Sequence, residues 1–267
     1  VIFSGARFDH VDLSEVSLIE AQLNDLDLSG ASFDGADLSG AELRRCTMVG
    51  TSFTRAILKS TNFSDSKLER ANLSHADLEG AELIGTDLTE ARLHETNLKG
   101  ARLRNADLSR ASLLEVNLRD ADCVDVTWED ATLKPTDLTN ARMPGAPLGV
   151  IKSAPCALES ADLSATELNN LNLEGMTLVS LTLNHAQLVS ANFKGADIRT
   201  LSASGANLNH ANLEGAQLSR ARLGKASLRE LDAGGVNLAG AQLNGADLTS
   251  AQLVGADLSE TQLTHAI

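Results

Sequence analysis

Tyrosine is absent from this chain of 267 residues, and aromatic residues of all kinds make up only 3% of it. Most globular cores use large aromatic side chains, so this core must be built from small aliphatic ones. The chain also lacks any apolar run of the ~20 residues that a membrane-spanning helix needs. We therefore expect no membrane insertion.

Cysteine is scarce too, and the three cysteines, Cys46, Cys123 and Cys156, show no CxxC or CxH spacing. An odd number of widely separated cysteines argues against a disulfide framework and against a zinc site. Basic residues are outnumbered, with 22 Lys and Arg against 36 Asp and Glu, for a formal charge of −14. This negative charge disfavours nucleic acid and anionic lipid as partners, because both carry phosphates.

What the sequence does contain is a five-residue repeat of the form A(D/N)Lxx, as in ANLSHADLEG and AQLNGADLTS. Counted in fives, the central leucine position recurs from Phe3 to Leu263 without an insertion or deletion. All six phenylalanines and the only tryptophan, Trp128, stand at this position, and alanine dominates two residues earlier. A period of five fits neither a helix nor a strand. It indicates a chain that turns a corner every five residues and buries these two positions.

Glycine and side-chain size support this interpretation. Of the 20 glycines, 17 lie two residues after the central position, where a corner with positive φ would favour them. Where the central residue is small, its neighbour is large: Leu201 precedes Ala203, Leu231 precedes Ala233, and an isoleucine at 151 precedes a serine at 153. A tube of fixed cross-section requires such compensation.

The A(D/N)Lxx pattern covers the whole chain and resembles the pentapeptide-repeat family. That resemblance implies an all-β fold, a right-handed quadrilateral parallel β-helix with twenty residues per coil and about thirteen coils. In such coils Phe33 would stack on Phe53, and Asn172, Asn192 and Asn212 would form a polar ladder outside. We expect a single continuous solenoid over residues 1–267.

The prolines interrupt the regularity of the chain around residues 134–156. All four fall on outward or corner positions and the count of five continues through them, so we predict irregular coils here rather than a linker. Proline removes a backbone donor, which weakens the local ladder. The segment either bends the solenoid or forms a docking region for a partner. The prolines of this candidate docking region are Pro135, Pro144, Pro147 and Pro155.

No constellation of catalytic residues stands out. A tube filled with Leu and Ala leaves no pocket to hold a nucleophile, a base or a metal, and inward cysteines should be inert. His75 and His94 come nearest to a metal pair, and solvated corners are the alternative interpretation. We therefore predict no catalytic residue, no metal site and no cofactor.

One acidic concentration is a candidate site for a partner. No Lys or Arg occurs from 120 to 133, and Trp128 lies within this stretch. The patch would recognise a basic partner, and the alternative is the ordinary solvated face of an acidic protein. Its members are Asp120, Asp122, Asp125, Glu129 and Asp130.

These features predict a non-catalytic rod that binds another protein or serves as a scaffold. The chain begins with VIFSG and ends with THAI, both inside repeats, so we expect a fragment or domain of a longer protein. Bare β-helix ends would also allow association between copies. The family resemblance implies fusion to other domains in bacterial proteins, including secretion-linked and effector proteins. It places the chain in the bacterial cytoplasm or, after secretion, in a host or target cell.

Two other functions stay open. Quinolone-resistance members of the family are acidic dimeric rods that occupy the DNA-binding saddle of DNA gyrase, and this chain is acidic and of suitable length. However, it shows neither the C-terminal dimerising element nor the loops of those members. DNA carries one charge per ~1.7 Å, so a rod of roughly 60 Å would replace roughly 35 charges, against a net −14 here. The remaining alternative is a structural spacer with no partner on its sides.

Overall fold

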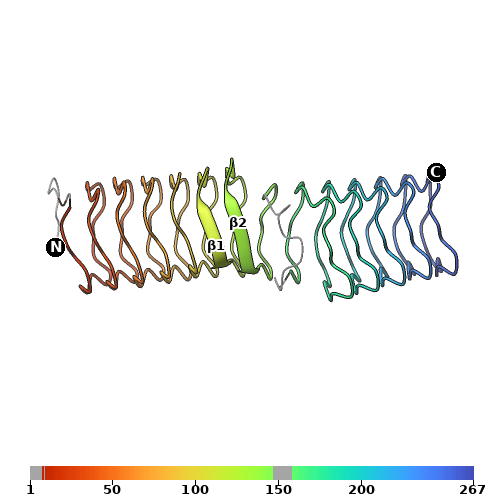
Figure 1. Cartoon of the computed structure of the whole chain (residues 1–267), viewed down its shortest axis with the longest axis horizontal. Helices are drawn as coiled ribbons and strands as arrows, with labels where there is room; N and C mark the ends of the chain where they lie inside the picture. Colours follow the sequence, from red (N-terminus) through yellow and green to blue (C-terminus); the bar gives the residue numbers. More distant parts are fainter. Residues whose placement is uncertain (1–7, 9, 147–157) are drawn as a thin grey trace. The chain divides into compact units, whose positions relative to one another are not determined.

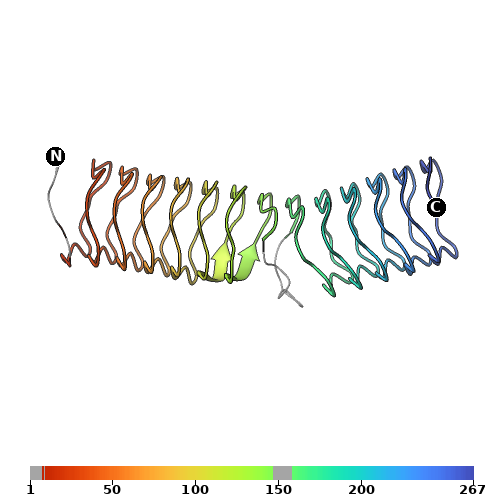
Figure 2. The ribbon, with the colours of Figure 1, turned by 90° about the horizontal axis from the view of Figure 1, so that it is seen from above.

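The computed structural model describes residues 8, 10–146 and 158–267, with the backbone alone for residues 134–136. Internal contacts divide the chain into two compact units, Val1–Arg142 and Met143–Ile267. Within each unit, successive coils of the chain stack on one another (Figures 1 and 2). Both units are therefore repeat β-solenoids, and a single continuous domain over residues 1–267 stays a prediction.

Parallel backbone pairing joins residues that lie twenty positions apart. In the first unit Asp12 pairs with Ser32, which in turn pairs with Ser52. In the second unit Ser202 pairs with Arg222 in the same way. Most of these pairs are single bridges, because each straight side of a coil is too short for a longer ladder. Each coil therefore takes twenty residues.

Two longer strands occur in the first unit, β1 (Ser112–Asn117) and β2 (Thr132–Asp137). They lie side by side in consecutive coils and pair in parallel (Figure 1). Among the residues that the structure describes there is no helix of the length and apolarity needed to cross a membrane.

Among the described residues from His10 onward, every fifth residue forms a corner with a left-handed backbone, except at Pro135. Glycine takes this conformation as expected, with φ of 66° at Gly30 and 65° at Gly85. Charged residues take it as well, with φ of 54° at Arg45 and 60° at Asp65. An L-residue in this region costs ~1–2 kcal/mol. Glycine is therefore favoured at a corner but not required, because the packed coil holds other residues there.

The core of each unit consists of the central Leu or Phe and the small residue two positions earlier. Leu108 in the first unit and Leu208 in the second are completely buried. The rings of Phe33 and Phe53 stack with centroids 5.2 Å apart and planes 8° apart, as the coil length predicts. The compensating pair Leu201 and Ala203 is also completely buried. Burial of each leucine contributes ~1.5–3 kcal/mol, so stability accumulates along a unit.

The Asp or Asn of the repeat stabilises the turn that follows it. The Oδ1 atom of Asp37 accepts hydrogen bonds from the backbone N–H and hydroxyl of Ser39, at 3.0 and 2.6 Å. Asn62 and Ser64 repeat this arrangement at 3.0 and 2.7 Å. Such local bonds are the usual role of Asp and Asn in turns. They explain why A(D/N)L recurs with a Ser or Thr just after it.

Polar residues at the alanine position are buried and still have partners. The hydroxyl of Thr51 donates a hydrogen bond to the carbonyl oxygen of Leu28 at 2.8 Å. The thiol of Cys46 donates to the carbonyl oxygen of Leu23 at 3.0 Å. Each bond reaches the previous coil, so these groups add contacts between coils without an unsatisfied buried donor.

Candidate functional site

The irregular part of the first unit begins where β1 pairs with β2. Ser112 to Leu114 pair with residues twenty positions later, but Val116 pairs with Pro135, and the pairing shifts on both sides of Val116. The corner residue of β1, Glu115, has a φ of 58°. A proline at the equivalent corner of the next coil cannot adopt this positive φ, because its ring holds φ near −65°. A proline at a corner position thus accounts for the local loss of register.

The candidate docking region is only partly described. Pro135 lies in β2 of the first unit, and Pro144 lies half-buried in a turn of the second unit. Pro147 and Pro155 lie outside the described residues. Docking at these prolines stays a prediction.

The predicted acidic patch is spread around one coil of the first unit. Asp120, Asp125 and Asp130 each stand at a left-handed corner, with φ of 59°, 60° and 54°. Because successive corners turn the chain onto a new side of the coil, these acids lie on three different edges. We call the whole set, from Asp120 to Asp130, the acidic band.

Two members of the acidic band, Asp122 and Asp120, lie beside cations, from adjacent coils for Asp122 and from the preceding residue for Asp120. The Oδ2 atom of Asp122 lies 2.6 Å from Nε of Arg104 and 3.7 Å from a terminal nitrogen of Arg142. Asp120 accepts a hydrogen bond from the amide of Asn140 at 2.8 Å and lies 3.6 Å from Arg119. The sequence interpretation missed Arg104 and Arg142 because it considered only residues 120–133. A register of twenty residues places Arg142 beside Asp122, whereas Arg104 lies 18 residues away and reaches Asp122 diagonally from the previous coil.

Three members of the band have no cation beside them within the described part of the chain. Asp125, Glu129 and Asp130 are exposed and form no ion pair with any residue that the structure describes. Trp128 lies between them in sequence but is only 8% exposed. Its indole contributes to the core, so the contact that this surface can offer a partner is electrostatic.

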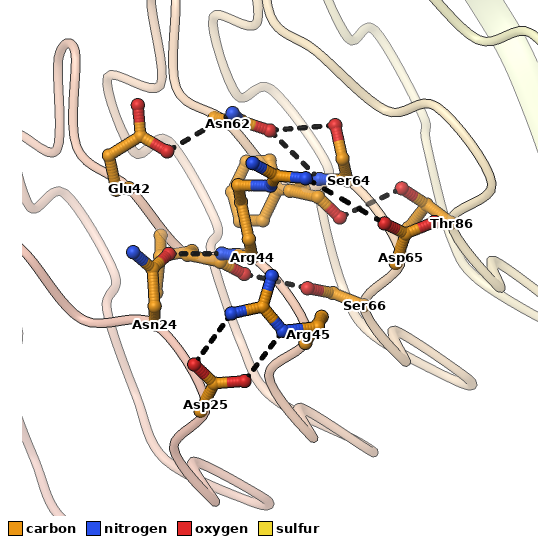
Figure 3. Close-up of polar contacts among 12 residues, drawn as sticks. Asn24, Asp25, Glu42, Arg44, Arg45, Asn62, Ser64, Asp65, Ser66 and Thr86 are labelled. Carbon is orange, nitrogen blue, oxygen red and sulfur yellow. Dashed lines mark hydrogen bonds and ion pairs between the residues drawn. The ribbon is translucent and has the colours of Figure 1, made fainter. Parts of the chain in front are cut away.

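Many acids of the first unit are, by contrast, paired with cations one coil away. Asp25 accepts two hydrogen bonds from Arg45, at 2.7 and 2.8 Å, which lower the pKa of Asp25 (Figure 3). Lys99 and Lys59 contact Glu79 at 3.0 and 3.2 Å, and their hydrogen bonds lower the pKa of Glu79. Asp125, Glu129 and Asp130 thus differ from these acids in having no cation beside them.

The histidine pair has a defined geometry but does not amount to a metal site. The rings of His75 and His94 lie 5.7 Å apart, and Glu95 contacts the two rings at 3.3 and 3.2 Å. Within residues 8, 10–146 and 158–267, no group of three His, Cys, Asp or Glu is arranged to hold a metal ion.

The two cysteines that the structure describes are buried thiols. Burial raises the pKa of Cys46, and burial together with the nearby Asp122 raises that of Cys123. A high pKa leaves little thiolate, which is the reactive form. Cys156 lies outside the described residues.

The chain forms coils of twenty residues, and two of every five residues point into the core. These features define the protein as a β-solenoid of five-residue repeats. A family model described as pentapeptide repeats matches residues 2–40, 36–74, 71–110, 156–199, 202–232 and 234–267. The chain belongs to the pentapeptide-repeat family. The matches leave out residues 111–155, the stretch that contains the acidic band and all four prolines.

Several solved structures are similar to this chain. HetL, a pentapeptide repeat protein involved in heterocyst differentiation regulation in the cyanobacterium Nostoc sp. strain PCC 7120, is 29% identical over 99% of this chain and 92% of its own, with a TM-score of 0.40. Rfr23 of the cyanobacterium Cyanothece 51142 is 26% identical over 47% of this chain and 89% of its own, with a TM-score of 0.36. QnrB1, a plasmid-mediated fluoroquinolone resistance protein, is 18% identical over 96% of this chain and 89% of its own, with a TM-score of 0.22. No curated protein sequence matches the chain.

Proposed function

We propose that this protein is a non-catalytic scaffold that binds a basic surface of another protein through Asp125, Glu129 and Asp130. One coincidence carries the proposal. These three acids have no cation partner among the described residues, and they lie in residues 111–155, which the family model does not match. A surface that had only to stay solvated would not need both features at the same place.

The chemistry of the site suits a partner with clustered Lys or Arg side chains. Exposed charges attract over roughly 8–10 Å at physiological salt, so the three acids steer a basic surface before contact. Because Trp128 is buried, little apolar area is available, and the complex should weaken as salt is added. The proposal takes the solenoid to be right-handed and four-sided, with about thirteen coils, as in the family.

The test compares the full chain with a variant that carries Asp125→Asn, Glu129→Gln and Asp130→Asn. Each chain is used as bait in a bacterial lysate, and bound proteins are identified by mass spectrometry. We expect a specific partner to be captured by the unchanged chain and lost from the variant. The control variant carries Glu15→Gln, Glu20→Gln and Glu167→Gln, which are also exposed and have no ion pair among the described residues.

The outcome is decided by which variant loses the partner. We call the variant of Asp125, Glu129 and Asp130 the band variant. If only the band variant fails to capture the partner, the proposal is supported. If the band variant and the control variant both fail to capture it, only the net charge matters. Equal capture by all three chains would refute the proposal.

DNA mimicry at gyrase is the competing function, and the surface of the first unit supports it less well. A mimic of a DNA backbone needs regularly spaced negative charge. Here Lys59, Glu79 and Lys99 alternate along one edge, so the charge there changes sign from coil to coil. Gyrase subunits captured by the unchanged chain and lost from the band variant would nevertheless identify gyrase as the partner.

A further inference from the structure

A second charged surface lies in the second unit and has the opposite sign. Arg220, Arg222 and Lys225 are all exposed. None of them makes an ion pair or a side-chain hydrogen bond with any residue that the structure describes, although the unit's other described cations, such as Lys194 and Arg199, are paired. We call Arg220, Arg222 and Lys225 the basic corner.

A recess of about 490 Å³ lies next to Arg220. Small residues line it: Ser219 directly precedes Arg220, and Ala239 and Gly240 lie in the next coil. Arg199 and Glu260 also line it. The recess therefore adjoins the basic corner at Arg220 and also contacts Arg199 of the preceding coil.

Glycines of the following coil support the basic side chains. A Cβ atom at Gly240 would lie 3.6 Å from Cγ of Arg220, and one at Gly245 would lie 3.6 Å from Cγ of Lys225. The aliphatic stem of each cation thus packs over a glycine, which is the usual way for a long charged side chain to bury its stem and expose its head.

The surroundings of the basic corner do little to compensate its charge. Arg222 pairs through its backbone with Ser202 and Gln242, which are both neutral. Asp197 forms its ion pair with Arg199, at 2.8 Å, and not with a residue of the basic corner. Glu260 is the acid that lines the recess, against Arg199 and Arg220. A chain with a net charge of −14 therefore carries a local positive surface.

We propose that the basic corner and its recess bind a short acidic peptide segment through its carboxylate groups. Arg220, Arg222 and Lys225 lie within six consecutive residues of one coil, so at ~3.3 Å per residue the cations span at most roughly 16 Å, the length of a few residues of extended peptide. Two or three carboxylates can be matched over that length. A long polyanion such as nucleic acid would extend onto the negative remainder of the molecule and be repelled. This inference uses a different surface from the proposed function and does not depend on it.

The test measures fluorescence anisotropy of a fluorescein-labelled hexaglutamate peptide with the full chain in low-salt buffer. A variant with Arg220→Gln, Arg222→Gln and Lys225→Gln should bind at least about tenfold more weakly, because three charge contacts are lost. A control variant with Arg45→Gln, Arg70→Gln and Arg102→Gln loses the same charge from ion-paired sites of the first unit. It should bind within about twofold of the unchanged chain.

Circular dichroism establishes that each variant is folded, and the single variant Arg222→Gln replaces the triple variant if the latter is not. The proposal is overturned if the peptide binds the basic-corner variant as well as the unchanged chain, or if both triple variants lose binding equally. Tighter binding of inorganic phosphate or of a twelve-nucleotide oligothymidine would also overturn it, by assigning the surface to phosphate ligands.

Discussion

The conformational strain of a left-handed corner is greatest where the corner residue is β-branched. Thr200 has a φ of 60°, a conformation that is a genuine outlier for a residue branched at Cβ. Gly240, at the equivalent corner two coils later, is free of this strain because it lacks a Cβ atom. The cost at Thr200 is therefore local and can be removed by one substitution.

Thr200→Gly should raise the free energy of unfolding by about 1 kcal/mol, because glycine takes positive φ without strain. Thermal unfolding followed by circular dichroism measures the change. The control is Ser202→Gly, which places glycine at a ladder position of the same unit, where it should destabilise by about 0.5–1 kcal/mol. A lower melting temperature for Thr200→Gly would contradict the strain argument.

At the scale of the coil, each element depends on its two neighbours. Leu108 is completely buried in the first unit, and its backbone N–H donates to the carbonyl of Thr127 one coil away at 2.9 Å. Because a solenoid has no contacts beyond adjacent coils, a break in one coil is not compensated elsewhere. The effect of one core substitution should thus spread to the coils on either side.

Leu108→Asp should unfold the middle coils of the first unit, since a buried carboxylate without a partner costs several kcal/mol, of the order of ~3–5. Hydrogen exchange should show lost protection in the coils before and after residue 108. Asp107→Asn is the matched control, because an amide oxygen can still accept the bonds that Asp107 receives from Ser109. A melt of Leu108→Asp that matches the unchanged chain would refute the inward assignment.

For the whole molecule, the repeated carboxylates make stability depend on pH. Bonds from the turn lower the pKa of Asp37 and Asp257, and those from Lys99 and Lys59 lower that of Glu79. A carboxyl whose folded pKa is below its unfolded value, about 4, contributes stability above that value. The contribution is lost as the pH falls through the folded pKa.

The melting temperature should therefore change little from pH 7 to about pH 5 and then fall steadily below about pH 4. The series is measured at ~0.15 M salt so that general charge repulsion is screened. Asp37→Asn should show a slightly shallower decline, since its amide cannot titrate. A melting temperature that rises on acidification from pH 4 to pH 2 would contradict this account.

The sequence named the acids of the candidate site but did not show which of them are paired with cations. Asp125, Glu129 and Asp130 stand in a stretch, residues 120–133, that contains no Lys or Arg, and their role in binding a partner stays a prediction. The ion pairs of Asp122 with Arg104 and Arg142 involve residues 18 and 20 positions away. The basic corner was missed for a related reason: its character depends on neutral and small residues in adjacent coils, not on its own local sequence.

The sequence by itself determined the class of fold and the inward positions, because a five-residue period of large and small apolar residues can bury them only by turning every five residues. The stacking of Phe33 on Phe53 was predicted from the twenty-residue coil that the family resemblance implies, and the structure confirms it. Only the tertiary structure decided which charges are neutralised, where the register is lost at Pro135, and which residues other than glycine hold a left-handed corner. These depend on side chains one coil away, and the stacking of coils is what brings them within reach.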